Sequence, residues 1–326
     1  MTTRRQILKG SIASIAGGLP FLANAQSMES AKFLAGFAPG GTIDTLARRV
    51  ATKLSGTYAK SMVVDNRTGA GGQIAISALK SSAPDGTTLL VTPMSMLGIY
   101  PHTYRKLPYD PVADLTPVSL GVVFDMGFAV GPQVPASIRT VPDFLAWCKA
   151  NPTNANFGSP APGSVPHFVG ELINRAGGID MRHIGFRGSQ PAILDLMGGQ
   201  IAAVSAPVGE FLSHLAGGRV RLLATTGATR SKFAPGVSTL VEQGLNDMVY
   251  GEWFGFYLPG KASADVVQKA NAAVRSALAD KEVVDSLAVM GLQAQSSTSA
   301  ELASLLQADT EKWRPIVKAI GFTAES

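Results

Sequence analysis

Short apolar segments alternate with amphipathic segments along most of the chain. The first such unit is an apolar run at residues 32–37, a turn at Ala38-Pro39-Gly40-Gly41, and apolar residues at helical spacing over residues 43–54. An apolar run that ends at proline and glycine is typical of a buried strand, and a 3.6-residue period is typical of a helix. Repeated units of this kind predict α/β layers on a largely parallel sheet.

The same pattern recurs to the end of the chain. Strands are predicted at residues 32–37, 62–65, 88–91, 118–123, 128–131, 156–158, 181–184, 201–204 and 220–225. Helices are predicted at residues 43–54, 73–80, 142–150, 165–176, 190–197 and 209–216, with two more between residues 264 and 290. Thr298 and Glu301 form a capping-box pattern, so a last helix is expected to begin there. Its apolar stripe, which ends at Ile320, is expected to pack on the core.

The two halves of the chain share this order of elements without sharing sequence. A proline-rich connection at residues 107–117 lies between them. If the chain crosses near residue 125 and returns near residue 228, the first domain comprises residues 26–125 and 228–326, and the second comprises residues 126–227. Two domains joined by two crossovers form a hinge with a cleft between them. The pattern therefore predicts a two-domain clamshell that binds its ligand in the cleft.

Residues 1–25 are expected to be an export signal. Thr3-Arg4-Arg5, followed by Ile7, Leu8 and Lys9, resembles a twin-arginine signal, and an uncharged stretch follows it. Ala23-Asn24-Ala25 is a small-x-small site, so cleavage after Ala25 and a periplasmic location are predicted. An uncleaved anchor is the alternative. No other segment approaches the ~20 apolar residues that a membrane helix needs.

Composition and charge narrow the class of protein. The chain is 46% hydrophobic and 16% charged, which is typical of a globular protein with a sizeable core. It carries 28 basic and 23 acidic residues, and three of the basic ones (Arg4, Arg5 and Lys9) lie in the predicted signal, so the mature chain would be nearly neutral. The sequence contains no basic run, so a nucleic acid is not expected as a partner.

The sequence offers little that indicates catalysis or metal binding. Cys148 is the only cysteine, which excludes an intrachain disulfide, and its helical spacing from Phe144 predicts a buried thiol. The four histidines lack the spacing of metal ligands, so neither a metal nor another cofactor is expected. Because no nucleophile-elbow or zinc-protease motif is present, we expect a binding protein and no enzyme. Nothing indicates an obligate oligomer, so a monomer is expected.

Two glycine-rich loops, at residues 37–44 and 157–167, are candidates for ligand binding. Each leads from a predicted strand into a predicted helix, and Thr42 and Ser164 are expected to be the N-cap residues. A helix N-terminus presents unpaired N–H groups and a partial positive charge, which together bind anions without a basic side chain. One such loop from each domain would hold a small carboxylate across the cleft.

Three charged or ionisable residues near these loops leave alternatives open. Asp44 either complements the helix dipole, or orients the loop or accepts a hydrogen bond from a ligand. His167 either donates to a carboxylate or packs in the first helical turn. Arg187 either reaches the cleft or is solvated.

Several short motifs follow one another along the chain in a characteristic order and spacing. They are Phe37-Ala-Pro-Gly-Gly-x-x-Asp44, Asn66-Arg67 with Gly69-Ala-Gly-Gly72, Leu107-Pro-Tyr-Asp-Pro111, Gly163-Ser164-x-x-His167, Gly185-Phe-Arg-Gly188 and Gly251-Glu-Trp-Phe-Gly255. Together they resemble the Bug receptors, the extracytoplasmic solute-binding proteins of tripartite tricarboxylate transporters. The resemblance covers residues 33–322.

The resemblance implies a Venus-flytrap fold of two α/β domains, without catalytic activity. It implies capture of a small organic carboxylate and its delivery to membrane permease subunits. A receptor for a signalling partner is the alternative role, and a secreted hydrolase is the remaining alternative class. The residues assigned to the ligand are Phe37, Ala38, Gly41, Thr42, Asp44, Ser159, Gly163, Ser164 and His167, with Ser95 and Arg187 as further candidates.

Two departures from the family pattern bear on the ligand. Many relatives carry an acidic residue where this chain has the apolar run 202–207, and such a residue could recognise an amino group. Its absence favours a plain or aromatic carboxylic acid over an amino acid. Pro160 and Pro162 remove N–H donors from the second loop, so its backbone cradle is expected to differ.

Overall fold

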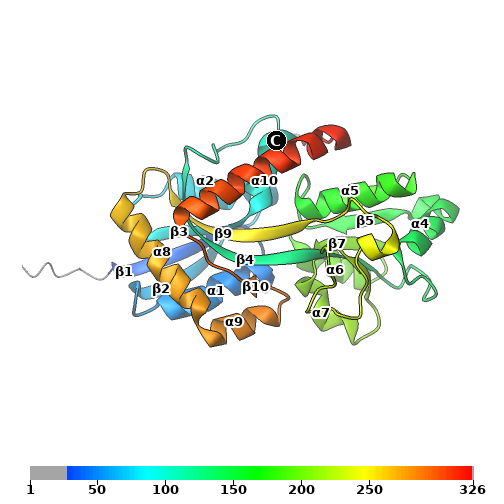
Figure 1. Cartoon of the computed structure of the whole chain (residues 1–326), viewed down its shortest axis with the longest axis horizontal. Coiled ribbons are helices and arrows are strands. Elements are labelled where there is room, and N and C mark those ends of the chain that lie inside the picture. The colour runs from blue at the N-terminus through cyan, green and yellow to red at the C-terminus, as the bar shows by residue number, and fades with distance from the viewer. Residues whose placement is uncertain (1–27, 325–326) are drawn as a thin grey trace, which may run out of the picture.

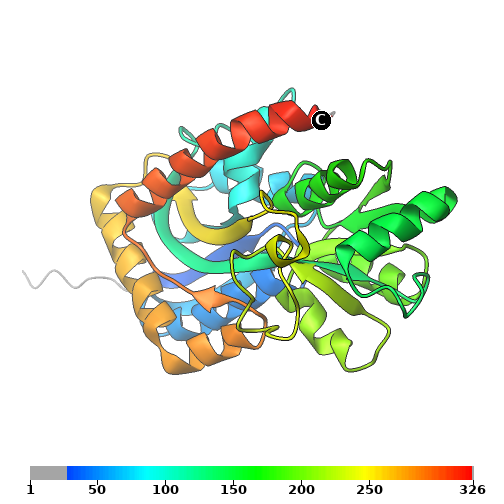
Figure 2. The same cartoon turned by 45° about the vertical axis from the view of Figure 1, so that its right-hand side comes forward.

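The computed structural model describes residues 28–324, which form two lobes side by side (Figure 1). The predicted export signal at residues 1–25 lies outside the described residues. Two long strands, β4 (Leu115–Val130) and β9 (Gly251–Pro259), run along the middle of the molecule, and β4 continues from the first lobe into the second (Figure 2). Among the described residues, no helix has the length and apolar character needed to cross a membrane.

The first lobe is built on a mixed sheet. Its strands lie in the order β2–β1–β3–β9–β4, and β10 pairs with β4. Besides β4 and β9 they are β1 (Met28–Ala35), β2 (Ala59–Asn66), β3 (Thr88–Pro93) and β10 (Gln293–Ala294). The β1 strand is parallel to both β2 and β3, whereas β9 and β4 are antiparallel to their neighbours. The parallel part is therefore the part made of the strand–turn–helix units that the sequence pattern predicts.

The second lobe repeats this arrangement on the other half of β4. Its strands are β5 (Asn156–Ser159), β6 (Arg182–Gly185), β7 (Ala203–Pro207) and β8 (Arg221–Thr225). The β5 strand is parallel to β6 and β7, and β4 is antiparallel to β7 and β8. The expected α/β clamshell is confirmed. Each sheet is mixed and not largely parallel, because the strands that connect the lobes enter it antiparallel.

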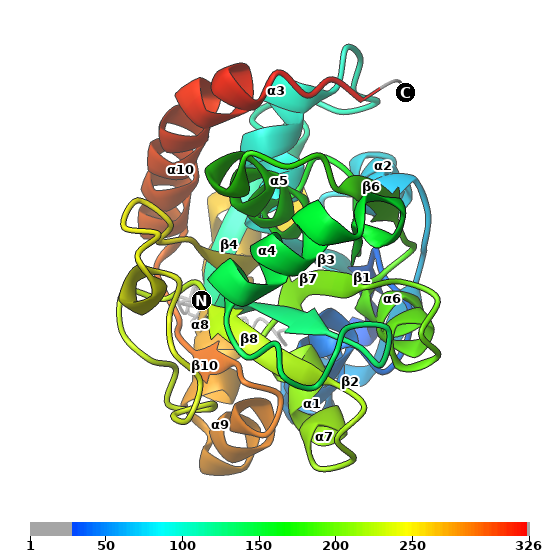
Figure 3. The same cartoon turned by 90° about the vertical axis from the view of Figure 1, so that its right-hand side faces the viewer.

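Helices cover the sheets of both lobes. In the first lobe they are α1 (Thr42–Leu54), α2 (Gln73–Lys80), α3 (Tyr100–Thr103), α8 (Ala264–Ala279), α9 (Lys281–Ala288) and α10 (Ser299–Ile320). In the second they are α4 (Val141–Ala150), α5 (Val165–Gly177), α6 (Ser189–Met197) and α7 (Gly209–Leu215). Figure 3, which faces the second lobe, shows α5 and α7 on opposite sides of its strands. Helices therefore cover both faces of the sheet in the second lobe.

The last helix and the cysteine agree with their sequence patterns. Thr298 and Glu301 form the capping box of α10, and Leu302 and Trp313 of its apolar stripe are buried. Phe168 of α5 packs on Trp313, with 6.0 Å between ring centroids, so α10 contacts the second lobe as well. Cys148 is buried, and its burial raises the pKa of the thiol to about 12. The prediction of a core thiol is confirmed.

Strand β4 corrects the sequence prediction of two separate strands at residues 118–123 and 128–131. The structure has one strand of 16 residues. Its pairing with β9 ends at Asp125, and its pairing with β7 begins at Met126. Asp125 and Gly127 are residue types common in turns, which is why the pattern suggested a break. Gly127 instead serves close packing, since a Cβ there would lie 2.7 Å from Leu222.

Hydrogen bonds hold much of the segment between residues 228 and 250 beside the strands of the second lobe. Leu240 N–H donates to the Thr225 carbonyl (2.9 Å), and the Gln243 side chain donates to the Leu223 carbonyl (2.7 Å), so this segment stays with the second lobe. Tyr250 N–H donates to the Thr226 carbonyl (3.0 Å) just before β9 begins. We propose that the second domain comprises residues 126–250 in place of 126–227.

Candidate functional site

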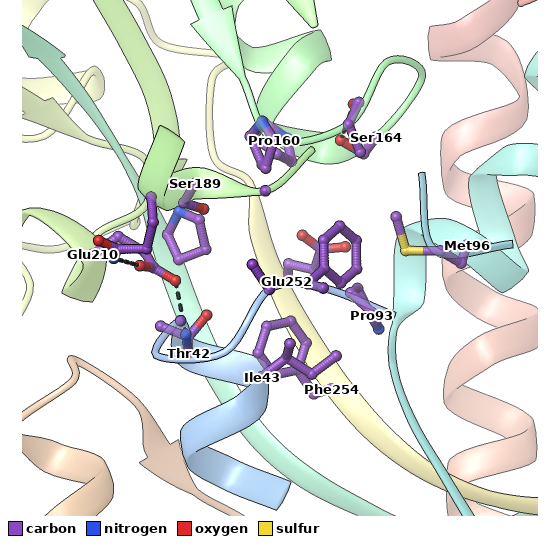
Figure 4. Close-up of a pocket in the computed structure, with 18 residues that line it drawn as sticks. Thr42, Ile43, Pro93, Met96, Pro160, Ser164, Ser189, Glu210, Glu252 and Phe254 are labelled. Atoms are coloured by element: carbon purple, nitrogen blue, oxygen red, sulfur yellow. Dashed lines mark hydrogen bonds between the residues drawn. The ribbon is translucent and has the colours of Figure 1, made fainter. Parts of the chain in front are cut away.

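A pocket lies between the lobes, where the N-termini of α1, α5 and α6 meet (Figure 4). Helix α1 belongs to the first lobe, whereas α5 and α6 belong to the second. The residues that line the pocket are Phe37, Ala38, Gly41, Thr42, Ile43, Pro93, Met96, Pro160, Ala161, Ser164, Pro166, Gly188, Ser189, Gln190, Pro207, Glu210, Glu252 and Phe254. Both loops that the sequence pattern singled out therefore contribute, together with a third helix end that it did not.

The first loop turns at Gly40 and enters α1 at Thr42. Gly40 has a φ of +87°, a left-handed conformation that favours glycine. Gly41 is the N-cap residue, since its backbone is extended and its carbonyl accepts a hydrogen bond from Thr45 N–H (2.9 Å). The expectation that Thr42 caps this helix is wrong by one residue. As the first helical residue, Thr42 instead directs its backbone N–H into the cleft.

Asp44 holds the first loop in place and does not line the pocket. Its carboxylate accepts hydrogen bonds from Gly40 N–H (3.0 Å), Arg48 Nε (2.8 Å) and Asn66 Nδ2 (2.9 Å). Burial raises the pKa of this carboxyl, but the hydrogen bonds from Arg48, Gly40 and Asn66 outweigh burial, so the pKa lies below its usual value. Among the alternatives for Asp44, the structure favours orientation of the loop.

We expect Asp44→Asn to lower the free energy of unfolding by about 1–3 kcal/mol at neutral pH, because three donors lose a charged acceptor that is itself buried. The pKa of Asp44 is lowered on folding, so its contribution is present above pH 3.8 and is lost as the pH falls further. Urea unfolding measures the loss. Asp65→Asn is the control, because Asp65 forms an exposed pair with Arg67 and should change stability by less than about 1 kcal/mol. Equal losses in the two variants would contradict the role of Asp44.

The second loop enters α5 at Ser164. Ser164 is the N-cap residue, as expected, but its hydroxyl donates to the Ala161 carbonyl (2.6 Å) and makes no capping hydrogen bond. Val165 N–H, the first helical donor, binds Ser95 Oγ of the first lobe (3.0 Å). Pro160, Pro162 and Pro166 supply no N–H at all. The backbone cradle at α5 is consequently poorer in donors than that at α1.

Ser159, Gly163 and His167 lie behind the second loop and do not line the pocket. Gly163 N–H donates to His167 Nδ1 (2.9 Å), which fixes the loop onto its own helix. Ser159 Oγ is hydrogen-bonded to His183 Nε2 (2.8 Å). The two imidazoles stack with 3.8 Å between centroids, and burial together with His167 lowers the pKa of His183 to about 3. These residues support the loop by packing, which was one of the alternatives for His167.

Ser95 and Arg187 differ from the other candidates. Arg187 is exposed and does not line the pocket, which agrees with the alternative that this arginine is solvated. Ser95 is buried, and both its N–H (3.1 Å) and its hydroxyl donate to Glu252 Oε1. Ser95 therefore links Val165 of the second lobe to a buried acid of the first.

Glu252 lines the pocket and belongs to the motif Gly251-Glu-Trp-Phe-Gly255, but it was not among the residues assigned to the ligand from sequence. It is 5% exposed, and its described hydrogen bonds both go to Oε1. Burial raises the pKa of this carboxyl to about 7, while the hydrogen bonds from Ser95 oppose the increase. The negative charge of Asp309 raises the pKa further. Glu252 thus titrates near neutral pH at the floor of the pocket.

Glu210 is the second buried acid of the pocket, and it too was missed. It belongs to α7 of the second lobe and reaches across to α1. Thr42 N–H donates to Glu210 Oε1 (2.8 Å), and Gln190 Nε2 donates to Oε2 (2.6 Å). Burial raises the pKa of this carboxyl, and the hydrogen bonds from Thr42 and Gln190 oppose the increase. No local signal in the sequence marks Glu210, because its partners are distant in the chain.

The electrostatics of the pocket come from helix ends and two acids. Of the described residues that line it, none is lysine, arginine or histidine. Positive potential is supplied by the N-termini of α1, α5 and α6. Five of the residues proposed from sequence line the pocket, namely Phe37, Ala38, Gly41, Thr42 and Ser164. Such a site can bind a small anion through backbone N–H groups.

The chain matches a known family over most of its length. The model of the tripartite tricarboxylate transporter family receptor matches residues 46–322. Protein BugT of Bordetella pertussis is 30% identical over 322 residues, which is 98% of this chain and 98% of that protein.

Two solved structures of similar fold contain a small ligand. One is MatC from Rhodopseudomonas palustris with bound malate, which has a TM-score of 0.82 and 28% identity and covers 88% of this chain and 98% of its own. The other is Rpa4515 of the same organism with adipate, which has a TM-score of 0.85 and 26% identity and covers 91% of this chain and 98% of its own. Both ligands are dicarboxylates.

Proposed function

Since this chain belongs to the tripartite tricarboxylate transporter receptor family, we propose that it captures a small organic carboxylate and delivers it to the membrane permease subunits of such a transporter. The observation that carries this proposal is the convergence of three helix N-termini on one pocket between the lobes. Helix ends bind anions through N–H groups and a partial positive charge. The family and the similar structures are receptors and binding proteins, so the function we propose is binding without catalysis.

We propose that the ligand carboxylate lies against the α1 and α6 ends of the pocket. Thr42 and Gly41 belong to the α1 end, and Ser189 and Gln190 belong to the α6 end. The α5 end contributes less, because Val165 N–H is already bound to Ser95 and three prolines surround it. The apolar side chains of Phe37, Met96 and Phe254 would contact the carbon skeleton. The malate and adipate named for two similar proteins support a dicarboxylate.

The place of action is also part of the proposal. The twin-arginine pattern at Arg4-Arg5 and the cleavage site after Ala25 support export to the periplasm. A receptor that is released there would meet its ligand outside the cytoplasmic membrane and its permease at the membrane surface.

We expect malate or adipate to raise the melting temperature of the mature protein, because a ligand that binds only the native state stabilises it. At a concentration of 100 times Kd the gain is about 2.7 kcal/mol. Differential scanning fluorimetry with a panel of aliphatic and aromatic acids measures the shift. The dimethyl esters of the same acids are the control, since they keep the carbon skeleton but lose the charge. If no acid in the panel raised the melting temperature, the proposed function would be contradicted.

A further inference from the structure

The carboxylate of Glu210 occupies the end of the pocket that we assign to the ligand. Its Oε1 accepts from Thr42 N–H at the start of α1 (2.8 Å), and its Oε2 accepts from Gln190 of the first turn of α6 (2.6 Å). Thr42 and Gln190 also line the pocket and belong to different lobes. Glu210 is 3% exposed, so this contact lies in the interior of the molecule. A protein carboxylate therefore binds the N-terminal N–H of α1 and the side-chain amide of Gln190, as a ligand carboxylate would.

A ligand carboxylate and the Glu210 carboxylate cannot both bind Thr42 N–H and Gln190 Nε2 without a large cost in free energy. Like charges a few ångströms apart repel each other strongly in a site that excludes water. Of the described residues that line the pocket, none carries a positive side chain that would offset a second negative charge. Glu252, the other acid of the pocket, adds to the repulsion whenever it is ionised. Thr42 has one backbone N–H, and Glu210 Oε1 already accepts it, so an incoming carboxylate must replace Glu210 at that donor.

The contact of Glu210 is also a connection between the lobes. It joins residues 168 positions apart, and a second connection joins Ser95 Oγ to Val165 N–H (3.0 Å). Each of the α1 and α5 ends thus receives an oxygen from the opposite lobe. The side chain of Ser95 is short and buried and is held by Glu252, whereas Glu210 has a longer and more flexible side chain on a short helix. Glu210 is consequently the one of the two that can swing aside.

We propose that Glu210 is a tethered competitor that holds the lobes together through Thr42 and exchanges places with the ligand carboxylate. This inference rests on the proposed function. A carboxylate attached to the protein has a high effective concentration at its own site, so it raises the ligand concentration needed for half-saturation. Glu210 would thereby restrict binding to acids that engage α1 and α6 together. A monocarboxylate with few other contacts would be displaced by it.

The test is isothermal titration calorimetry of malate and adipate into wild type, Glu210→Ala and Glu210→Gln at pH 8. We expect affinity to rise about tenfold in Glu210→Ala and by a smaller factor in Glu210→Gln, which keeps an oxygen acceptor for Thr42 N–H. Asp180→Ala is the matched control, since it removes one exposed negative charge from the same lobe and should leave affinity unchanged. Circular dichroism checks folding, and Glu210→Gln retains the shape of the side chain if Glu210→Ala is unstable.

The outcomes separate this inference from the proposed function. Tighter binding by both Glu210 variants, or binding by the variants where wild type shows none, supports a tethered competitor. Equal or weaker binding by the variants would overturn the inference and leave the proposed function intact, and weaker binding would show that Glu210 helps to hold the bound ligand. Absence of binding by every variant would reject both proposals.

Discussion

Replacing Gly209 by alanine is expected to lower ligand affinity roughly 100-fold, because the new methyl group would prevent the lobes from closing. A Cβ at Gly209 would lie 1.6 Å from the Met290 carbonyl oxygen and 2.3 Å from its carbon. Gly209 begins α7 of the second lobe, and Met290 precedes β10 of the first. Both sides of this contact are backbone, so no side chain can rotate away. Overpacking of this kind costs about 3 kcal/mol, which corresponds to the stated loss of affinity.

The same variant should also separate the lobes in solution. Small-angle X-ray scattering should show a larger radius of gyration for Gly209→Ala than for wild type. Gly217→Ala is the matched control at the end of the same region, since its Cβ would meet only the His214 carbonyl at 3.7 Å. Wild-type affinity and scattering in Gly209→Ala would contradict a closure contact at this position.

Replacing Glu252 by glutamine is expected to stabilise the protein at pH 8 by about 3 kcal/mol. The unfolded carboxyl ionises near pH 4.5, whereas burial raises its pKa in the folded state to about 7. Below pH 4.5 both states hold the proton and folding carries no penalty. Between pH 4.5 and about pH 7 only the unfolded state releases the proton of Glu252, so the free energy of unfolding falls as the pH rises toward and through the folded pKa. Glutamine is neutral throughout, and its side-chain oxygen can still accept from Ser95.

Urea unfolding of wild type and Glu252→Gln at pH 4, 6 and 8 measures this difference, which should be near zero at pH 4 and largest at pH 8. Glu301→Gln is a control of opposite sign, because hydrogen bonds from Thr298 lower the pKa of Glu301. A difference that does not depend on pH would refute the titration of Glu252. The same ionisation places a negative charge at the pocket, so dicarboxylate affinity should fall above pH 7 in wild type but not in Glu252→Gln.

The parts of the fold that could be predicted from sequence are those with local causes. The helix over residues 43–54 follows from its apolar period, and the start of α10 follows from Thr298 and Glu301. Both loops that lead into α1 and α5 were found from their glycines and their position after apolar runs. Strand β4 was read as two strands because Asp125 and Gly127 are turn-like residues. Whether they end a strand depends on the partners β9 and β7.

The candidate site was only partly predictable for the same reason. Phe37, Ala38, Gly41, Thr42 and Ser164 line the pocket, because their loops were recognisable from composition. Four other residues of those loops face away from the pocket, namely Asp44, Ser159, Gly163 and His167. Sequence alone does not reveal which side of a loop faces a cleft. Ser95 and Arg187 are likewise placed away from the lining by packing and exposure. The α6 end, with Ser189 and Gln190, directly follows the motif Gly185-Phe-Arg-Gly188 and was missed, because only the side chain of Arg187 was considered there.

Sequence by itself determined most of the helices and the parallel strands of this protein, the two glycine-rich helix starts and the family to which the chain belongs, but not the long strands β4 and β9. Each of these depends on residues within about one turn of helix or on the order of motifs along the chain. Tertiary structure alone decided that Glu210 meets Thr42 and that Glu252 meets Ser95, across 168 and 157 residues of chain. Those contacts set the charge of the pocket, because burial and hydrogen bonding are properties of the folded arrangement and not of any local pattern.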